Sequence, residues 1–149
     1  MSVAKSFRDL NVYRAARAAA GEVYQVSKSF PREERFSLTD QIRRSSRATK
    51  AMIAEAWVRR RYRGVFINKL SEALGEAAET QSWLDSALDS GYITPEQLTR
   101  MDADWQSVGA MLARMIDRAD FCKNPSDTDY RVREDAGEDG EWEAVIGDL

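Results

Sequence analysis

The sequence predicts an all-α protein: an antiparallel up-down four-helix bundle followed by an acidic C-terminal tail. Apolar residues recur every three or four positions in four segments, and helix-start and helix-stop residues separate those segments. No segment shows the alternating pattern of a β-strand, and 149 residues suit a single domain. We expect the bundle at 1–119, with helices at about 9–29, 37–61, 65–90 and 95–119, and the tail at 120–149.

The first helix is expected to begin after Asp9, a suitable N-cap, and to stop before Pro31, which lacks an amide donor. The second is expected to begin at Ser37, which has the spacing of a capping pair with Asp40. The residues that we place on the inner faces of these two helices are Leu10, Tyr13, Ala16, Ala20, Val23, Tyr24 and Ser27, and then Leu38, Ile42, Ser45, Thr49, Met52, Ile53 and Ala56.

Glycines and a capping box mark the remaining boundaries. Gly64 predicts a break before the third helix, and Gly91 predicts its end. Gly75, inside the third helix, predicts a close approach of another helix. The fourth helix has the clearest start, with Thr94 as N-cap and Gln97 closing a capping box.

Composition excludes most catalytic chemistry. The chain has no histidine, which removes His-based acid–base catalysis and nearly all zinc sites. An enzyme would have to use carboxylates, Lys or Tyr alone, so we expect no enzymatic activity, no cofactor and no metal. The single cysteine and the lack of about 18 consecutive apolar residues predict a cytoplasmic protein that does not contact a membrane.

The net charge of −3 hides an uneven distribution. Residues 28–69 contain 12 basic and 4 acidic side chains, whereas residues 119–149 contain 3 basic and 10 acidic ones. The tail sequence is also rich in turn-forming residues, which favours disorder, although its apolar end from Trp142 to Leu149 could instead dock onto a surface. This asymmetry predicts a polyanionic partner for the basic segment.

The basic residues concentrate on the second helix and the connection after it. Clustered guanidinium groups match phosphate oxygens well, so we predict that these residues bind RNA or DNA without sequence specificity. No aromatic residue interrupts the basic stripe, which argues against base stacking. An alternative stays open, in which the stripe is a solvated surface paired with Glu72, Glu76 and Glu79 of the third helix. The candidate nucleic-acid-binding residues are Arg43, Arg44, Arg47, Lys50, Arg59, Arg60, Arg61 and Arg63.

Apolar residues outside the main stripe of the third helix predict self-association. Ile67, Ala78 and Trp83 widen its apolar surface, which small bundles usually bury in an oligomer. On the second helix, Glu55 lies in an apolar sequence and is expected to need a basic partner, an Arg of its own helix or of a neighbouring chain.

Several segments resemble the bacterial 23S rRNA intervening-sequence protein family. They are FRDLNVYRAA at 7–16, FSLTDQIRRSS at 36–46, IAE at 53–55 and ALGEAAE at 73–79, and the similarity extends over about residues 7–118. The chain differs where Met52 replaces a usual Asn and Ala56 a usual Gly. The resemblance implies a four-helix bundle without enzymatic activity. Relatives of that family include accessory proteins of diversity-generating retroelements, which form five-membered rings and bind nucleic acid and a reverse transcriptase.

From the residues and the resemblance together, we expect a homo-oligomer, a pentamer by resemblance, whose partners are itself, RNA or DNA, and another protein. The alternative is a protein-interaction scaffold in which the basic stripe forms salt bridges between subunits and has no role with nucleic acid.

Overall fold

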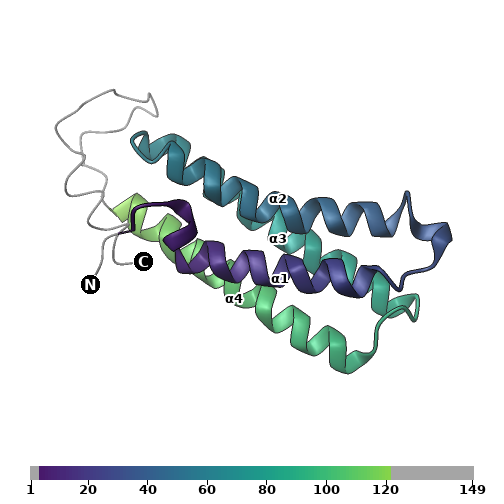
Figure 1. Cartoon of the computed structure of the whole chain (residues 1–149). Coiled ribbons are helices and arrows are strands. Elements are labelled where there is room, and N and C mark those ends of the chain that lie inside the picture. The colour runs from purple at the N-terminus through teal and green to yellow at the C-terminus, as the bar shows by residue number, and fades with distance from the viewer. Residues whose placement is uncertain (1–3, 122–149) are drawn as a thin grey trace.

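A computed structural model describes residues 4–121, and this part of the chain is entirely helical apart from its short connections. The four helices are α1 (Asn11–Ser27), α2 (Leu38–Val58), α3 (Arg63–Asp89) and α4 (Pro95–Phe121) (Figure 1). Two short 3-10 turns, η1 (Phe7–Asp9) and η2 (Arg32–Glu34), precede α1 and α2. The predicted all-α bundle is confirmed. The predicted acidic tail lies outside the described residues, apart from residues 120 and 121, which end α4.

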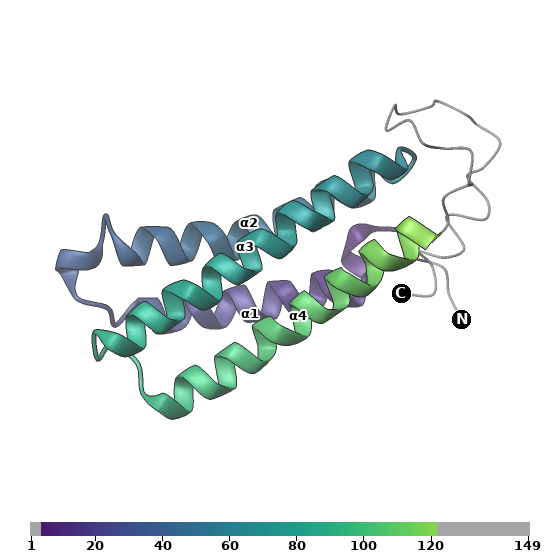
Figure 2. The same ribbon diagram turned by 180° about the vertical axis from the view of Figure 1, so that it is seen from behind.

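Each helix packs against two others. α2 contacts α1 and α3, and α4 contacts α3 and α1, so that α1 and α3 lie on opposite corners of the bundle. Viewed from one side, α1 and α2 form the near surface (Figure 1), and the opposite view shows α3 and α4 in front (Figure 2). No other helix within residues 4–121 lies in front of the surface that α1 and α2 share.

The core consists of two apolar clusters along the bundle axis. One contains Ile53, Phe66 and Leu112, and the other contains Ile42, Leu84 and Trp105. On α2, the stretch between the two clusters carries Ser45 and Thr49, which are buried. The Ser45 hydroxyl lies 2.8 Å from that of Thr80 on α3, and Thr49 donates to the carbonyl oxygen of Ser45. These bonds satisfy polar groups that would otherwise be costly to bury.

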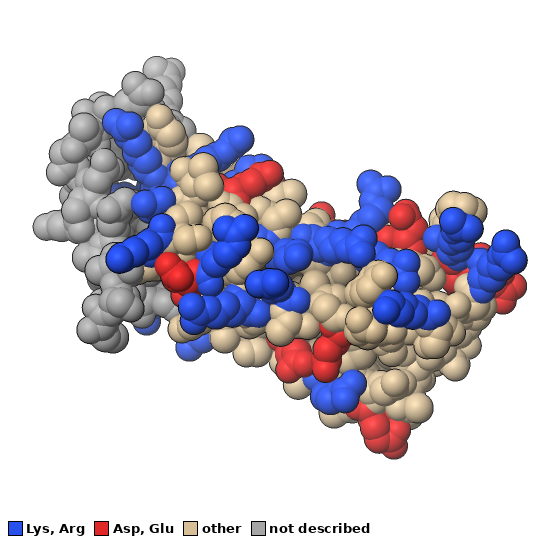
Figure 3. All heavy atoms as spheres, viewed as in Figure 1, with Lys and Arg blue, Asp and Glu red and all other residues tan. Residues whose placement is uncertain are grey.

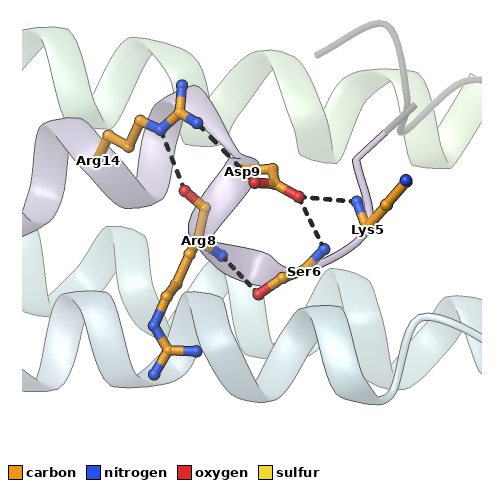
Figure 4. Close-up of polar contacts among 5 residues, drawn as sticks. All are labelled: Lys5, Ser6, Arg8, Asp9 and Arg14. Carbon is orange, nitrogen blue, oxygen red and sulfur yellow. Dashed lines mark hydrogen bonds and ion pairs between the residues drawn. The ribbon is translucent and has the colours of Figure 1, made fainter. Parts of the chain in front are cut away.

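The start of α1 differs from the prediction. Asp9 is not its N-cap, because it forms the last residue of η1 and Leu10 occupies the cap position. Instead, Oδ2 of Asp9 accepts hydrogen bonds from the backbone nitrogens of Lys5 (2.9 Å) and Ser6 (3.1 Å), while Ser6 Oγ accepts from the backbone of Arg8 (Figure 4). The carboxylate thus caps the turn before α1.

The start of α2 also differs. Ser37 makes no side-chain capping bond, so the predicted pair with Asp40 is wrong. Glu34 of η2 takes its place, because Oε2 of Glu34 accepts from the backbone nitrogen of Leu38 at 3.0 Å. The η2 turn brings this carboxylate to the helix N-terminus, where negative charge is favoured.

Two glycine predictions are wrong and one is right. The break between α2 and α3 falls before Arg63, and Gly64 lies within the first turn of α3. A Cβ atom added at Gly75 would meet no atom of another helix within 4 Å, so no helix of residues 4–121 approaches this glycine closely. Gly91 adopts a φ of 76° after α3, and Thr94 and Gln97 form both bonds of the predicted capping box.

Candidate nucleic-acid interface

Arg43, Arg47 and Lys50 share the side of α2 that faces α1. Their spacing of four and three residues keeps them within about 60° of one another around the helix. The space-filling view shows Lys and Arg side chains running along the surface that α1 and α2 form (Figure 3). We call Tyr24, Lys28, Arg43, Arg47 and Lys50 the α1–α2 basic surface.

Tyr24 of α1 lies at the centre of this surface. It was expected on the inner stripe of its helix, but it is 37% exposed. Its ring centroid lies 4.9 Å from Lys28 Nζ, 4.9 Å from Arg43 Cζ and 5.4 Å from Arg47 Cζ. The prediction that no aromatic residue interrupts the basic stripe is therefore wrong, because the aromatic ring comes from the neighbouring helix.

A buried hydroxyl fixes the position of one of these guanidinium groups. Arg43 Nε donates to Ser27 Oγ at 2.7 Å, and the same hydroxyl donates to the carbonyl oxygen of Tyr24 at 2.8 Å. Ser27 is only 2% exposed, so this bond ties Arg43 to the end of α1. Arg43 thus keeps its remaining guanidinium nitrogens close to Tyr24 in a defined orientation.

No carboxylate neutralises the basic surface within the described part of the chain. Among residues 4–121, no Asp or Glu oxygen lies within 4.0 Å of a side-chain nitrogen of Lys28, Arg43, Arg47 or Lys50. The predicted pairing with Glu72, Glu76 and Glu79 is wrong for Arg43, Arg47 and Lys50. Those acids belong to α3 on the other side of α2. Within residues 4–121, the surface therefore has a positive charge that no contacting carboxylate offsets, and such a charge attracts polyanions.

The other predicted basic residues have different surroundings. Arg44 lies about 100° around α2 from Arg43 and pairs with Asp40 at 3.7 Å. Arg60 covers the ring of Trp57 at 4.0 Å and donates to its carbonyl oxygen. Arg63 is partly buried, whereas Arg59 and Arg61 are exposed after the end of α2. The structure therefore groups two of the eight candidates, Arg43 and Arg47, around Tyr24, and helical spacing places Lys50 on the same side of α2.

Glu55 is not a buried acid. Its side chain is 47% exposed, and its partner is neither an arginine nor a neighbouring chain but Lys69 of α3, at 3.1 Å. Lys69 also contacts Glu72 at 3.2 Å, and its hydrogen bonds to Glu55 and then Glu72 raise its pKa. Farther along α3, burial raises the pKa of Glu76, as do the nearby Glu79 and Glu72. The α2–α3 side of the bundle thus holds acids and bases in contact with one another, unlike the α1–α2 side.

The three residues predicted to form an oligomer interface do not lie together. Ile67 and Ala78 share one flank of α3, and Trp83 lies about 160° from Ile67 around the helix. Ile67 and Trp83 are partly buried against the two core clusters, and the Trp83 indole donates to Glu79. Only Ala78 is exposed, so these three residues do not outline one apolar patch.

Sequence reasoning missed Tyr24, Ser27 and Lys28 as members of the site. The sequence did offer one signal, because Tyr24 directly follows Val23 and both were placed on the inner face. In the structure, Val23 is the one that is fully buried. One residue corresponds to about 100° around a helix, so Val23 and Tyr24 do not point in the same direction. The residues that Tyr24 meets on α2, however, depend on how α1 packs against that helix.

The described residues offer neither a membrane span nor a metal site. No helix within residues 4–121 is both long and apolar enough to span a bilayer. The same part of the chain contains no cluster of three or more His, Cys, Asp or Glu side chains that could hold a metal ion.

Comparison with known proteins agrees with this architecture. The model of the 23S rRNA-intervening sequence protein family matches residues 8–114. A solved structure from Bacteroides thetaiotaomicron, a protein of unknown function from the S23 ribosomal protein family, is 33% identical with a TM-score of 0.65. The alignment covers 71% of this chain and 95% of that one. No curated protein matches the chain. With a family match over most of its length and a bundle fold, this chain belongs to the 23S rRNA-intervening sequence protein family.

Proposed function

We propose that this protein is a non-catalytic, homo-oligomeric bundle that binds nucleic acid without sequence specificity through the α1–α2 basic surface. The observation that carries the proposal is the convergence of Lys28, Arg43 and Arg47 on one exposed ring with no carboxylate nearby among the described residues. Such a surface suits the regularly spaced charges of a phosphate backbone, and each contact with a phosphate releases condensed counterions.

The chemistry of the surface favours backbone contacts over base readout. Sequence is read mainly by side chains that enter a groove and bond to base edges, whereas Lys and Arg on an exposed helix flank contact phosphates. Family membership supports the oligomer, and by resemblance a pentamer. Repetition of a weak site around a ring would raise the overall affinity through avidity.

Charge reversal tests the proposal. We expect Arg43→Glu/Arg47→Glu to abolish binding of a fluorescent RNA hairpin and a DNA duplex at low salt, measured by fluorescence anisotropy. The matched control is Arg114→Glu/Arg118→Glu, which changes the charge equally on exposed positions of α4 and should weaken binding far less. For the unaltered protein, log K on duplex DNA should fall with log salt concentration by about 0.9 per phosphate contacted.

Absence of binding by the unaltered protein at low salt would contradict the proposal, as would equal effects of the two double variants. Circular dichroism of each variant shows whether the bundle is still folded, since Arg43 also bonds to Ser27.

A second candidate is a protein-interaction scaffold whose basic surface forms salt bridges between subunits. The lack of carboxylate partners for Arg43, Arg47 and Lys50 within residues 4–121 is compatible with acidic partners on another subunit. In that case Arg43→Glu/Arg47→Glu would dissociate the oligomer in multi-angle light scattering, and the unaltered protein would have no appreciable affinity for nucleic acid.

A further inference from the structure

We infer that Tyr24, together with Lys28, Arg43 and Arg47, forms a site for an unpaired nucleotide, and that the preferred ligand is single-stranded nucleic acid. This inference rests on the proposed function and deepens it by naming the ligand class. The charge of the surface accounts for an attraction to any polyanion. The aromatic ring at its centre favours single-stranded nucleic acid over a duplex.

The ring of Tyr24 is partly exposed, although a surface that binds by charge alone does not need an exposed aromatic ring. It is one of three large hydrophobic side chains that are exposed among the described residues; the others are Phe36 and Val58. Neither of those two has several cations around it: Phe36 is approached by Arg35 alone, and Val58 has no ring for a cation to cover. Tyr24 therefore combines a partly exposed aromatic ring with concentrated positive charge.

The cations come from two different helices and converge on the ring. Lys28 lies one turn after Tyr24 at the end of α1, while Arg43 and Arg47 lie one turn apart on α2. Three like charges within about 5 Å of one ring repel one another, and the negative face of the aromatic ring offsets that repulsion only in part. A phosphate placed among them would relieve the repulsion and accept bidentate hydrogen bonds from the guanidinium groups.

The site is held in place before any ligand arrives. The bond from Arg43 Nε to the buried Ser27 hydroxyl fixes one guanidinium, and the carbonyl of Tyr24 accepts a bond from the same hydroxyl. This network reduces the side-chain entropy that ligand binding would otherwise remove. Pre-organisation of this kind is expected of a binding site and is not needed for a merely solvated surface.

A single strand fits this arrangement better than a duplex does. In a duplex the faces of the bases are stacked on one another inside the helix, so an exposed tyrosine ring cannot stack on them. An unpaired base can stack on the tyrosine ring or on a guanidinium plane that covers it, while its phosphate contacts the adjacent cations. Arg17, seven residues before Tyr24 on α1, and Lys50, three residues after Arg47 on α2, extend the charge along the direction in which a strand would continue.

Substitution of the ring tests the inference. The probes are a labelled oligo-dT and a labelled duplex of equal length, titrated with the full-length protein at one low salt concentration. We expect Tyr24→Leu, which retains an apolar side chain without a ring, to weaken oligo-dT binding about tenfold. Duplex binding should stay within about twofold of the unaltered protein, because its stacked bases never reach the ring. Tyr24→Phe, which keeps the ring, is the matched control and should bind oligo-dT like the unaltered protein.

Several results would overturn the inference while leaving the proposed function intact. An equal loss for oligo-dT and duplex in Tyr24→Leu would mean that the ring only spaces the arginines. Tighter binding of duplex than of oligo-dT would contradict the preference directly. Heparin offers a further comparison. If heparin displaces oligo-dT and duplex equally well, and Tyr24→Leu does not change this displacement, the surface binds polyanions in general. Lack of affinity for both probes would refute the proposed function itself.

A second measurement uses the unaltered protein and so does not depend on the folding of a variant. Oligo-dT containing 5-iododeoxyuridine is irradiated in the complex, and the cross-linked peptide is identified by mass spectrometry. We expect the cross-link at Tyr24, because this photochemistry favours aromatic side chains stacked on the modified base. A cross-link confined to other aromatic residues would place the bases elsewhere and refute the site.

Discussion

Asp9 shows how one carboxylate can organise the entry of the chain into the bundle. It accepts two backbone hydrogen bonds from the preceding turn and lies 3.9 Å from Arg14, whose Nε bonds to the carbonyl of Arg8 (Figure 4). The backbone bond from Lys5 contributes most to lowering the pKa of Asp9 below its ordinary value of 3.8; the bond from Ser6 and the charge on Arg14 contribute further, against an opposing effect of burial.

The lowered pKa of Asp9 predicts a specific pH dependence. Because the folded state favours the carboxylate, Asp9 stabilises the fold above pH 3.8, and this stabilisation is lost as the pH falls through the lower, folded-state pKa. We expect Asp9→Asn to have a lower Tm than the unaltered protein at neutral pH, and the difference to shrink under strongly acidic conditions. Thermal unfolding of both proteins across the acid range measures this. A difference in Tm that does not vary with pH would contradict it.

At the scale of helices, the pairing of α2 with α3 includes a polar contact inside an apolar core. Thr80 is fully buried, and its hydroxyl bonds both to Ser45 across the helix interface and to the carbonyl of Glu76. Since the Thr80 hydrogen goes to Glu76, Ser45 donates its single hydrogen to Thr80, and the carbonyl oxygen of Ile42, 3.3 Å away, is only an alternative acceptor for it. Directional bonds of this kind specify one register of α2 against α3, which apolar packing alone specifies less strictly.

The Ser45–Thr80 bond can be measured with a double-mutant cycle. Thr80→Val keeps the shape of the side chain and removes the hydroxyl, and Ser45→Ala removes the other partner. We expect each single variant to lower the free energy of unfolding by about 1 kcal/mol. The double variant should lose less than the sum, since the shared bond can be lost only once. Urea denaturation gives the three values, and strict additivity would show that the hydroxyls do not interact.

At the scale of the whole molecule, charge is divided between different regions of the chain. The α1–α2 basic surface carries cations without carboxylate partners among residues 4–121, whereas residues 122–149 contain 9 acidic and 3 basic side chains. We expect this acidic segment and a polyanionic ligand to compete for the same cations. The strength of that competition falls with salt, as for other exposed charges.

Truncation tests this competition. We expect the protein ending at Phe121, the last residue of α4, to bind oligo-dT and duplex more tightly than the full-length chain at low salt, because the removed segment is acidic. The gain should fade as salt rises. A control that keeps the length of the segment but replaces its Asp and Glu residues by Asn and Gln should reproduce the gain. Unchanged affinity of the truncated protein would show that the segment does not compete with nucleic acid.

The sequence by itself determined the four helices, because apolar periodicity, the capping box at Thr94 and the glycine at 91 act within a few residues along the chain. It also identified Arg43, Arg47 and Lys50 as sharing a helix flank, which follows from helical spacing alone. Only the tertiary structure decided that Tyr24 and Ser27 belong to the same surface, because their contacts with Arg43 depend on how α1 packs against α2. The contact of Lys69 with Glu55 was undecided for a similar reason, because it depends on how α2 packs against α3. The bond from Leu38 to Glu34 spans only four residues and was missed because the cap was expected at Ser37. Local periodicity determines which side chains share one face of a helix, and the packing of the helices determines which residues those side chains contact.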